Sequence, residues 1–99
     1  LTIRNQEMLA KIEGDILCFY KDKEKGKVAV SVDLVTATVA KGKAASGRPG
    51  FVIADRNDKW IVETHNPGVA QEWVDHIKSA IIVAWTRKYE PETLAMKKL

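Results

Sequence analysis

The sequence lacks most features that mark a secreted or membrane-spanning protein. Its single cysteine, Cys18, cannot form an internal disulfide, which excludes a disulfide-stabilised scaffold and favours a reducing compartment. The longest uninterrupted apolar run, residues 80–85, is far shorter than the roughly 20 residues that cross a bilayer. No signal-peptide pattern opens the chain, and its start at Leu1 without a Met is expected of a domain cut from a larger protein.

Residues for catalysis and metal binding are also scarce. The chain has two histidines, His65 and His76, and neither has a spacing to Cys18 that is typical of a metal site. The phosphate-binding patterns GxGxxG and GxxxxGK[ST] are absent, and the glycines of residues 47–50 lack the strand-to-helix setting of a phosphate loop. We therefore expect no enzymatic activity, no metal ion and no cofactor.

The net charge of +3 is too small to indicate nucleic-acid binding, and the basic segment has few interleaved aromatic side chains for base stacking. The basic excess is localised, however. Residues 21–48 hold seven basic and three acidic side chains, whereas residues 49–99 hold seven of each. A basic segment on a nearly neutral chain indicates a surface that meets anions.

The 99 residues correspond to one domain, and the first two-thirds has the pattern of short strands separated by turns. The spacing is that of a small antiparallel sandwich or barrel. Within residues 27–32, strict alternation puts Val28, Val30 and Val32 on one face. Residues 41–50 are rich in glycine and predict a loop. The seven expected strands are residues 1–4, 8–12, 16–20, 27–32, 34–39, 51–54 and 59–64.

The hydrophobic period then changes to that of a helix. Asn66 is a suitable N-cap, and Pro67 fits the first helical position, where its missing N–H would be unpaired in any case. Pro91 limits the helix to about residue 88 or 89. An apolar stripe at steps of three and four follows the cap: Val69, Trp73, Ile77, Ala80, Ile81 and Ala84.

These patterns predict a mainly β fold with one C-terminal α-helix. We expect a seven-stranded antiparallel barrel or sandwich over residues 1–88, capped by the amphipathic helix. Residues 89–99 are expected to form a tail or a short second helix.

Several segments resemble the pleckstrin homology (PH) domain. LTIR at residues 1–4 looks like the first strand of that family. KIEGDILCFYKD at residues 11–22 is similar to the end of the second strand, the glycine turn and the third strand. WIVETHNPGVAQEWVDHI at residues 60–77 resembles the last strand and the helix. YKDKEKGKVAVSVD at residues 20–33 is also similar to the PH domain of dynamins.

The resemblance implies core positions near the end of the domain. Trp73 matches the helix tryptophan typical of the family, which implies a buried residue that plugs one end of the barrel. Trp60, Val62 and Thr64 take the inward positions of the last strand. Replacing a buried tryptophan with alanine costs on the order of 3–5 kcal/mol, a large part of the stability of a small domain.

Many PH domains bind phosphoinositide headgroups, and the resemblance implies where. The family takes basic residues from the end of its first strand and the start of its second, and often a tyrosine from the end of its third. Arg4 and Tyr20 match that pattern, whereas residues 5–8 lack the basic pair and include Glu7. A multiply phosphorylated ring needs several converging donors, so a trisphosphate headgroup is not the expected ligand.

A lysine run supplies the other cationic feature, because alternate residues of an extended chain point the same way. A lysine near an anionic membrane contributes about 1 kcal/mol, and its point charge suits phosphatidic acid or a monophosphorylated inositide. We therefore expect a cytoplasmic, peripheral membrane-targeting domain with a lysine-rich loop. The candidate headgroup-binding residues are Arg4, Tyr20, Lys21, Lys23, Lys25, Lys27, Lys41, Lys43 and Arg48.

Two other interpretations remain open. One is a solvated charged hairpin without a partner. The other is a protein-docking PH domain with little lipid affinity, because the C-terminal half of the helix carries apolar residues off its stripe. The partner would be residues 89–99 folding back, the parent protein or another chain. The residues off the stripe are Val74, Ile82, Val83 and Trp85.

Overall fold

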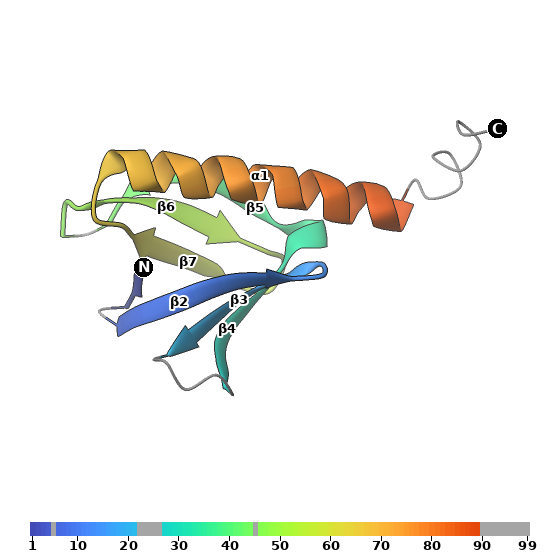
Figure 1. The fold of residues 1–99 in the computed structure, drawn as a ribbon, viewed down its shortest axis with the longest axis horizontal. Helices are drawn as coiled ribbons and strands as arrows, with labels where there is room; N and C mark the ends of the chain where they lie inside the picture. The colour runs from blue at the N-terminus through green and yellow to red at the C-terminus, as the bar shows by residue number, and fades with distance from the viewer. Residues whose placement is uncertain (5, 22–26, 45, 90–99) are drawn as a thin grey trace.

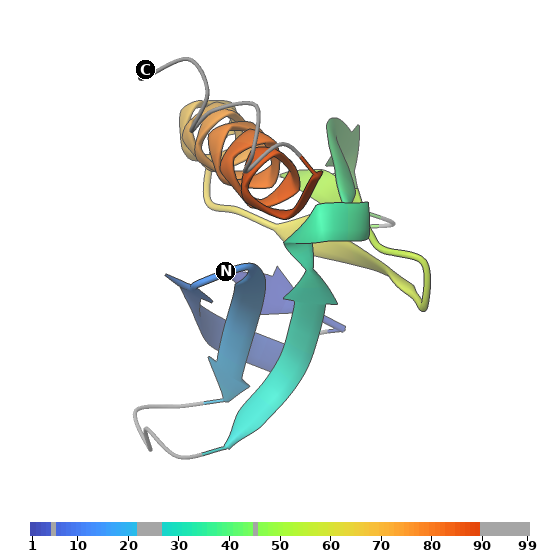
Figure 2. The same cartoon turned by 90° about the vertical axis from the view of Figure 1, so that its right-hand side faces the viewer.

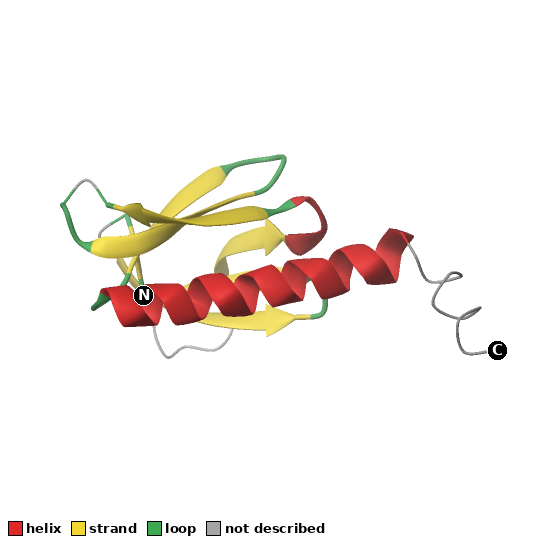
Figure 3. Ribbon diagram, turned by 90° about the horizontal axis from the view of Figure 1, so that it is seen from above, coloured by secondary structure: helices red, strands yellow, loops and turns green. Residues whose placement is uncertain are grey.

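The computed structural model describes residues 1–4, 6–21, 27–44 and 46–89. These residues form seven strands, one short 3-10 helix and one long α-helix (Figures 1 and 3). The mainly β class with a C-terminal helix is therefore confirmed. The strands are β1 (Thr2–Ile3), β2 (Gln6–Glu13), β3 (Ile16–Lys21), β4 (Val28–Asp33), β5 (Thr38–Lys43), β6 (Pro49–Ala54) and β7 (Lys59–Glu63). The helices are η1 (Leu34–Thr36) and α1 (Pro67–Tyr89).

The strands form one antiparallel sheet in the order β4-β3-β2-β1-β7-β6-β5. The predicted antiparallel sheet is thus confirmed, but it is not closed into a barrel: β4 and β5 are its two edges over the described residues. Figure 2 shows the sheet bent, with β2–β4 on the side away from α1 and β5 and β6 on the side near it. α1 packs on β5, β6 and η1.

The core fills the space between the bent sheet and α1. Trp60, Val62 and Thr64 are buried, as predicted for the last strand. The Thr64 hydroxyl donates to the Asn66 carbonyl oxygen at 2.9 Å, which joins the end of β7 to the start of α1. The largest fully buried side chains are Phe19, Phe51, Ile3, Leu17, Leu34, Ile53, Ile77, Val32, Val62 and Val74.

The helix begins where its local chemistry predicts. The Asn66 side-chain oxygen accepts a hydrogen bond from the Val69 N–H at 2.9 Å, and Pro67 is the first helical residue. Figure 3 shows α1 running along the sheet, with its last turns extending past it. Residues 90–99, on which the predicted tail or second helix falls, lie outside the described residues.

The predicted stripe of α1 faces the core, and its members Ile77 and Ala84 are buried, but the centre of the buried face is rotated from the stripe. Val74, predicted to lie off the stripe, is 2% exposed, whereas Trp73 is only partly buried and packs against the margin of the core. The prediction of Trp73 as an enclosed plug is wrong. Because the sheet is open, α1 lies along it and does not close a barrel end. The buried residues of α1 are Ala70, Val74, Ile77 and Ala84.

The predicted strand over residues 34–39 is wrong in its first half. The Asp33 carboxylate accepts a hydrogen bond from the Val35 N–H at 3.1 Å and caps η1. The strand β5 therefore begins later, at Thr38, and continues to Lys43. The predicted loop over residues 41–50 is correspondingly shortened, because residues 41–43 pair with β6.

A register shift in the β3–β4 pair changes the face of Val28. Val30 lies opposite Phe19, but Val28 lies opposite Tyr20, and Ala29 is the extra residue between them. Directly opposed residues share a face of the sheet, so Val28 turns to the outer face, away from the core. The prediction that Val28 shares a face with Val30 is therefore wrong, and 46% of Val28 is exposed.

Candidate anion-binding end of the sheet

Three strand connections leave the sheet at one end. The residues that line a shared pocket, together with the strand pairing, show which strand ends lie together. Glu7, Arg48 and His65 line one pocket, so the start of β2, the start of β6 and the start of α1 share one end of the sheet, on the left of Figure 1. Lys21 pairs with Met8, so β3 ends there as well. The β2–β3, β4–β5 and β6–β7 connections share the other.

The first of these ends carries six exposed basic side chains among the described residues, and we call it the basic end. The same end carries two carboxylates among the described residues, Glu7 and Glu63. Lys23 and Lys25 belong to the same sequence segment but lie outside the described residues. The basic end is defined by Arg4, Lys21, Lys27, Lys41, Lys43 and Arg48.

The basic residues form separate groups along this end. Lys21 and Lys27 flank the β3–β4 connection at one edge of the sheet, whereas Lys41 and Lys43 lie in β5, at the opposite edge. Arg4 lies between them in the β1–β2 turn, with a φ of 51°. The described cations thus spread over a broad end and do not surround one pocket.

Tyr20 is directed away from the basic end. Its hydroxyl donates to a Glu13 carboxylate oxygen at 3.2 Å, and Glu13 ends β2 at the opposite end of the sheet. Desolvation by burial and the Glu13 carboxylate raise the pKa of Tyr20. Its hydroxyl is therefore neutral and already hydrogen-bonded, unlike that of the headgroup-binding tyrosine implied by the resemblance.

Cys18 lies two residues before Tyr20 in β3, on the same outer face of the sheet, and is 5% exposed. Its thiol donates to Glu13 at 3.9 Å, and the Glu13 carboxylate also pairs with the Lys11 ammonium group at 3.4 Å. Desolvation by burial, followed by the Glu13 charge, raises the pKa of the Cys18 thiol. A thiol that is covered and kept protonated is a poor nucleophile.

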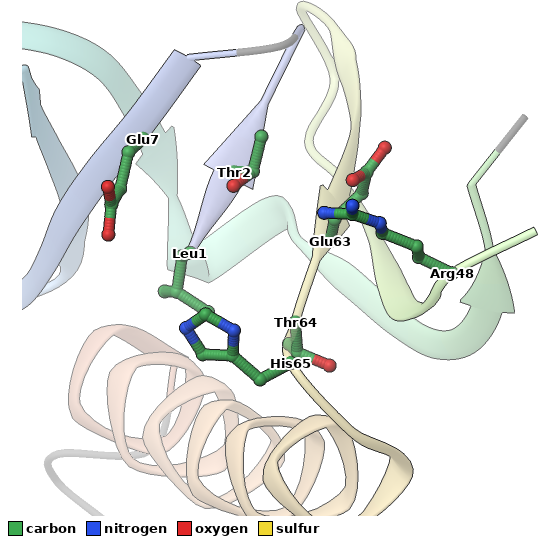
Figure 4. Close-up of a pocket in the computed structure, with 7 residues that line it drawn as sticks. All are labelled: Leu1, Thr2, Glu7, Arg48, Glu63, Thr64 and His65. Carbon is green, nitrogen blue, oxygen red and sulfur yellow. The ribbon is translucent and has the colours of Figure 1, made fainter. Parts of the chain in front are cut away.

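A pocket of about 210 Å³ lies at the middle of the basic end (Figure 4). Arg48 lies beside Glu63 in this view. The Ser46 hydroxyl donates to Glu63 at 3.2 Å. Because Glu7 also lines the pocket, an anion there would face two carboxylates. The lining residues are Leu1, Thr2, Glu7, Arg48, Glu63, Thr64 and His65.

A second hollow, of about 270 Å³, lies between β5, β6 and the start of α1. Lys41 and Lys43 border it, and no acidic residue is part of its lining. Sequence reasoning missed this placement because it treated both lysines as loop residues. The available signal was their alternation with Val39, since the three residues lie on one face of an extended strand. The lining also includes Gly42, Pro49, Gly50, Pro67 and Ala70.

The opposite end of the sheet carries acidic and basic side chains together. A hollow of about 450 Å³ there is lined by Asp15, Ile16, Ser31, Asp33, Val35, Asp55, Asn57 and Lys88. The Asp15 carboxylate accepts from the Arg87 guanidinium at 3.4 Å. No group of three or more His, Cys, Asp or Glu residues that could hold a metal ion occurs within the described part of the chain.

Asp55 organises this opposite end. Its carboxylate accepts backbone N–H groups of Asp33 at 3.0 Å, Asn57 at 2.8 Å and Asp58 at 3.0 Å. Desolvation by burial raises the pKa of Asp55, but these hydrogen bonds together outweigh it and leave the pKa below its ordinary value. Asp55 thus holds the β6–β7 turn against the end of β4, and its role is structural.

The sequence matches no protein-family model and none of the curated proteins with which it was compared. The arrangement of a seven-stranded antiparallel sheet and a C-terminal helix is compatible with a PH-like fold. Among the described residues, no helix is long and apolar enough to span a membrane.

Proposed function

We propose that this chain is a PH-like, non-catalytic domain that targets its protein to the surface of anionic membranes. The observation that supports the proposal is the excess of basic side chains at one end of the sheet. Among the described residues, this end carries six exposed basic side chains and two carboxylates. A membrane approached from that end would meet a cationic surface.

The spread of the cations favours small headgroups over a multiply phosphorylated ring. Lys21 and Lys27 lie at one edge of the sheet and Lys41 and Lys43 at the other, so each pair meets a different lipid. Lysine binds phosphate as a point charge and does not need the forked geometry of arginine. Phosphatidic acid and monophosphorylated inositides are therefore the preferred ligands, with about 1 kcal/mol from each lysine.

Sedimentation with vesicles tests this function. The domain is expected to bind phosphatidylcholine vesicles that contain phosphatidic acid or a monophosphorylated inositide, and not vesicles of phosphatidylcholine alone. A variant with Lys21, Lys23, Lys25 and Lys27 each changed to glutamate is expected to lose most of this binding. Undiminished binding of that variant would refute the proposal.

The salt dependence of binding separates two modes of recognition. Attraction between exposed charges is screened over roughly 8–10 Å at physiological salt, so binding by dispersed lysines falls steeply as salt is added. Binding that resists salt would instead indicate an enclosed phosphate site. The hollow beside Lys41 and Lys43 is the first place to examine in that case, by changing both lysines to alanine.

A second candidate function is protein docking through α1. Ile82 is 65% exposed, Trp85 45% and Tyr89 55%, and their spacing of three and four residues puts them on one flank of the helix. The rings of Trp85 and Tyr89 lie 5.0 Å apart between centroids. A domain that ignores all anionic vesicles but self-associates through this flank would support docking, with Trp85→Ala as the variant that restores the monomer.

A further inference from the structure

An apolar row crosses the outer face of three strands close to the basic end. Leu9 of β2 lies opposite Tyr20 of β3, which lies opposite Val28 of β4. Directly opposed residues share a face, so the three side chains are neighbours, and we call them the outer row. Leu9 is 56% exposed and Val28 46%. The row exists because the register shift turns Val28 outward.

Cationic groups adjoin the outer row. Lys21 directly follows Tyr20, and Lys27 directly precedes Val28, so two exposed lysines lie at the ends of the two strands that carry the row. Lys21 pairs with Met8 and leaves the backbone on the other face of the sheet, at its rim. The polar tip of Tyr20 is hydrogen-bonded to Glu13, on the side away from the lysines. Apolar side chains therefore lie directly behind a cationic rim.

We propose that the outer row enters the interfacial region of an anionic bilayer while the adjoining lysines hold lipid headgroups. The inference rests on the proposed function and adds a second, apolar contact to it. Cationic groups beside exposed apolar and aromatic side chains are the combination that binds at the headgroup–acyl boundary. The row holds only three side chains, whereas a stable protein interface takes about 800 Å² from each partner. A bilayer needs no such area, so it is the occupant that fits.

The same outer face supplies a matched control at its other end. Ile16 of β3 is 45% exposed, nearly the same fraction as Val28. Its cross-strand neighbours are Glu13 and Asp33, which are both acidic. An exposed isoleucine in an acidic setting is expected to stay away from an anionic membrane.

The test compares threonine variants, because threonine keeps the β-propensity of the strands and removes apolar surface. Sedimentation with vesicles of phosphatidylcholine and phosphatidic acid is measured at low and at high salt. The double variant Leu9→Thr/Val28→Thr is expected to bind about tenfold more weakly than the original chain. Its deficit persists at high salt, where the lysine contribution is screened. Ile16→Thr is expected to bind within about twofold of the original chain.

Three other results of this experiment would contradict either the inference or the proposed function. If the original chain binds and the double variant binds equally well, the outer row does not enter the membrane, and the proposed function stands. If the original chain does not bind these vesicles even at low salt, the proposed function fails, and this inference fails with it. If the original chain is a dimer that Val28→Thr converts to a monomer, a second copy occupies the row and the inference is wrong. Circular dichroism confirms that each variant is folded.

Discussion

A matched pair of isoleucine substitutions in α1 tests the packing of the helix on the sheet. Ile77 is 0% exposed and belongs to the core, whereas Ile82, five residues later on another face of the helix, is 65% exposed. Both changes to alanine gain the same small amount of helix propensity, so the difference between them measures burial alone. Ile77→Ala is expected to lower the free energy of unfolding by about 2–5 kcal/mol, because it leaves a cavity between α1 and the sheet.

Ile82→Ala is expected to change the free energy of unfolding by no more than about 0.5 kcal/mol. Each kcal/mol lowers the melting temperature of a domain of this size by roughly 4–8 °C, so calorimetry separates the two variants easily. Urea unfolding gives the free energies independently. Equal costs at the two positions would refute the helix orientation, and a large cost at Ile82 would mean that its flank is covered in solution.

Three further predictions concern the sheet and its outer face. Gly50→Ala is expected to abolish cooperative unfolding or to lower the free energy of unfolding by several kcal/mol, because a Cβ there overlaps the carbonyl oxygen of Val62 on the paired strand. Gly14→Ala is the control: nothing lies within 4 Å of its added Cβ, so it costs only the roughly 1–2 kcal/mol of its positive φ. Cys18 is expected to react with a thiol reagent at pH 8 only as fast as the domain unfolds, and rapid modification of the folded domain would contradict its burial and its raised pKa. Because the pKa of Asp55 is lowered in the folded state, its carboxylate stabilises the fold above the ordinary pKa of about 4, and this stability is lost as the pH falls below that value. Asp55→Asn should therefore weaken the dependence of stability on pH in this range, measured as acid unfolding by circular dichroism. An unchanged pH profile would contradict the assignment.

Features set by neighbouring residues were predictable from the sequence. The start of α1 depends on Asn66 and Pro67, which act through their own backbone and side chain. The inward positions of β7 follow from alternation, and Val62 is fully buried as expected. The number of strands also follows from local turn signals.

Features set by pairing between strands were not predictable. The face of Val28 depends on a bulge whose position is decided by the fit of β4 to β3, and nothing in the residues around Val28 marks it. The extension of β5 to Lys43 is an intermediate case, because the alternation of Val39, Lys41 and Lys43 indicates a strand but only the pairing with β6 carries it through Gly42. The orientation of α1, which buries Val74 in place of Trp73, depends on whether the sheet closes into a barrel.

The candidate site also has one part that was predictable from the sequence and one part that was not. The charge count located the basic segment between residues 21 and 48, because charge is a property of composition. Where those charges lie relative to one another is a property of topology, since it depends on which connections share an end. The outer row was not predicted at all, because the register of three strands creates it.

The most direct test of the account compares two double charge reversals on vesicles of phosphatidylcholine and phosphatidic acid. Lys21→Glu/Lys27→Glu changes the basic end, and Arg56→Glu/Lys59→Glu changes exposed residues at the opposite end by the same net charge. Binding through the basic end predicts a loss of roughly 30-fold or more in the first variant and less than about threefold in the second. Equal losses in the two variants would show that net charge alone attracts the domain and would contradict a binding surface at the basic end.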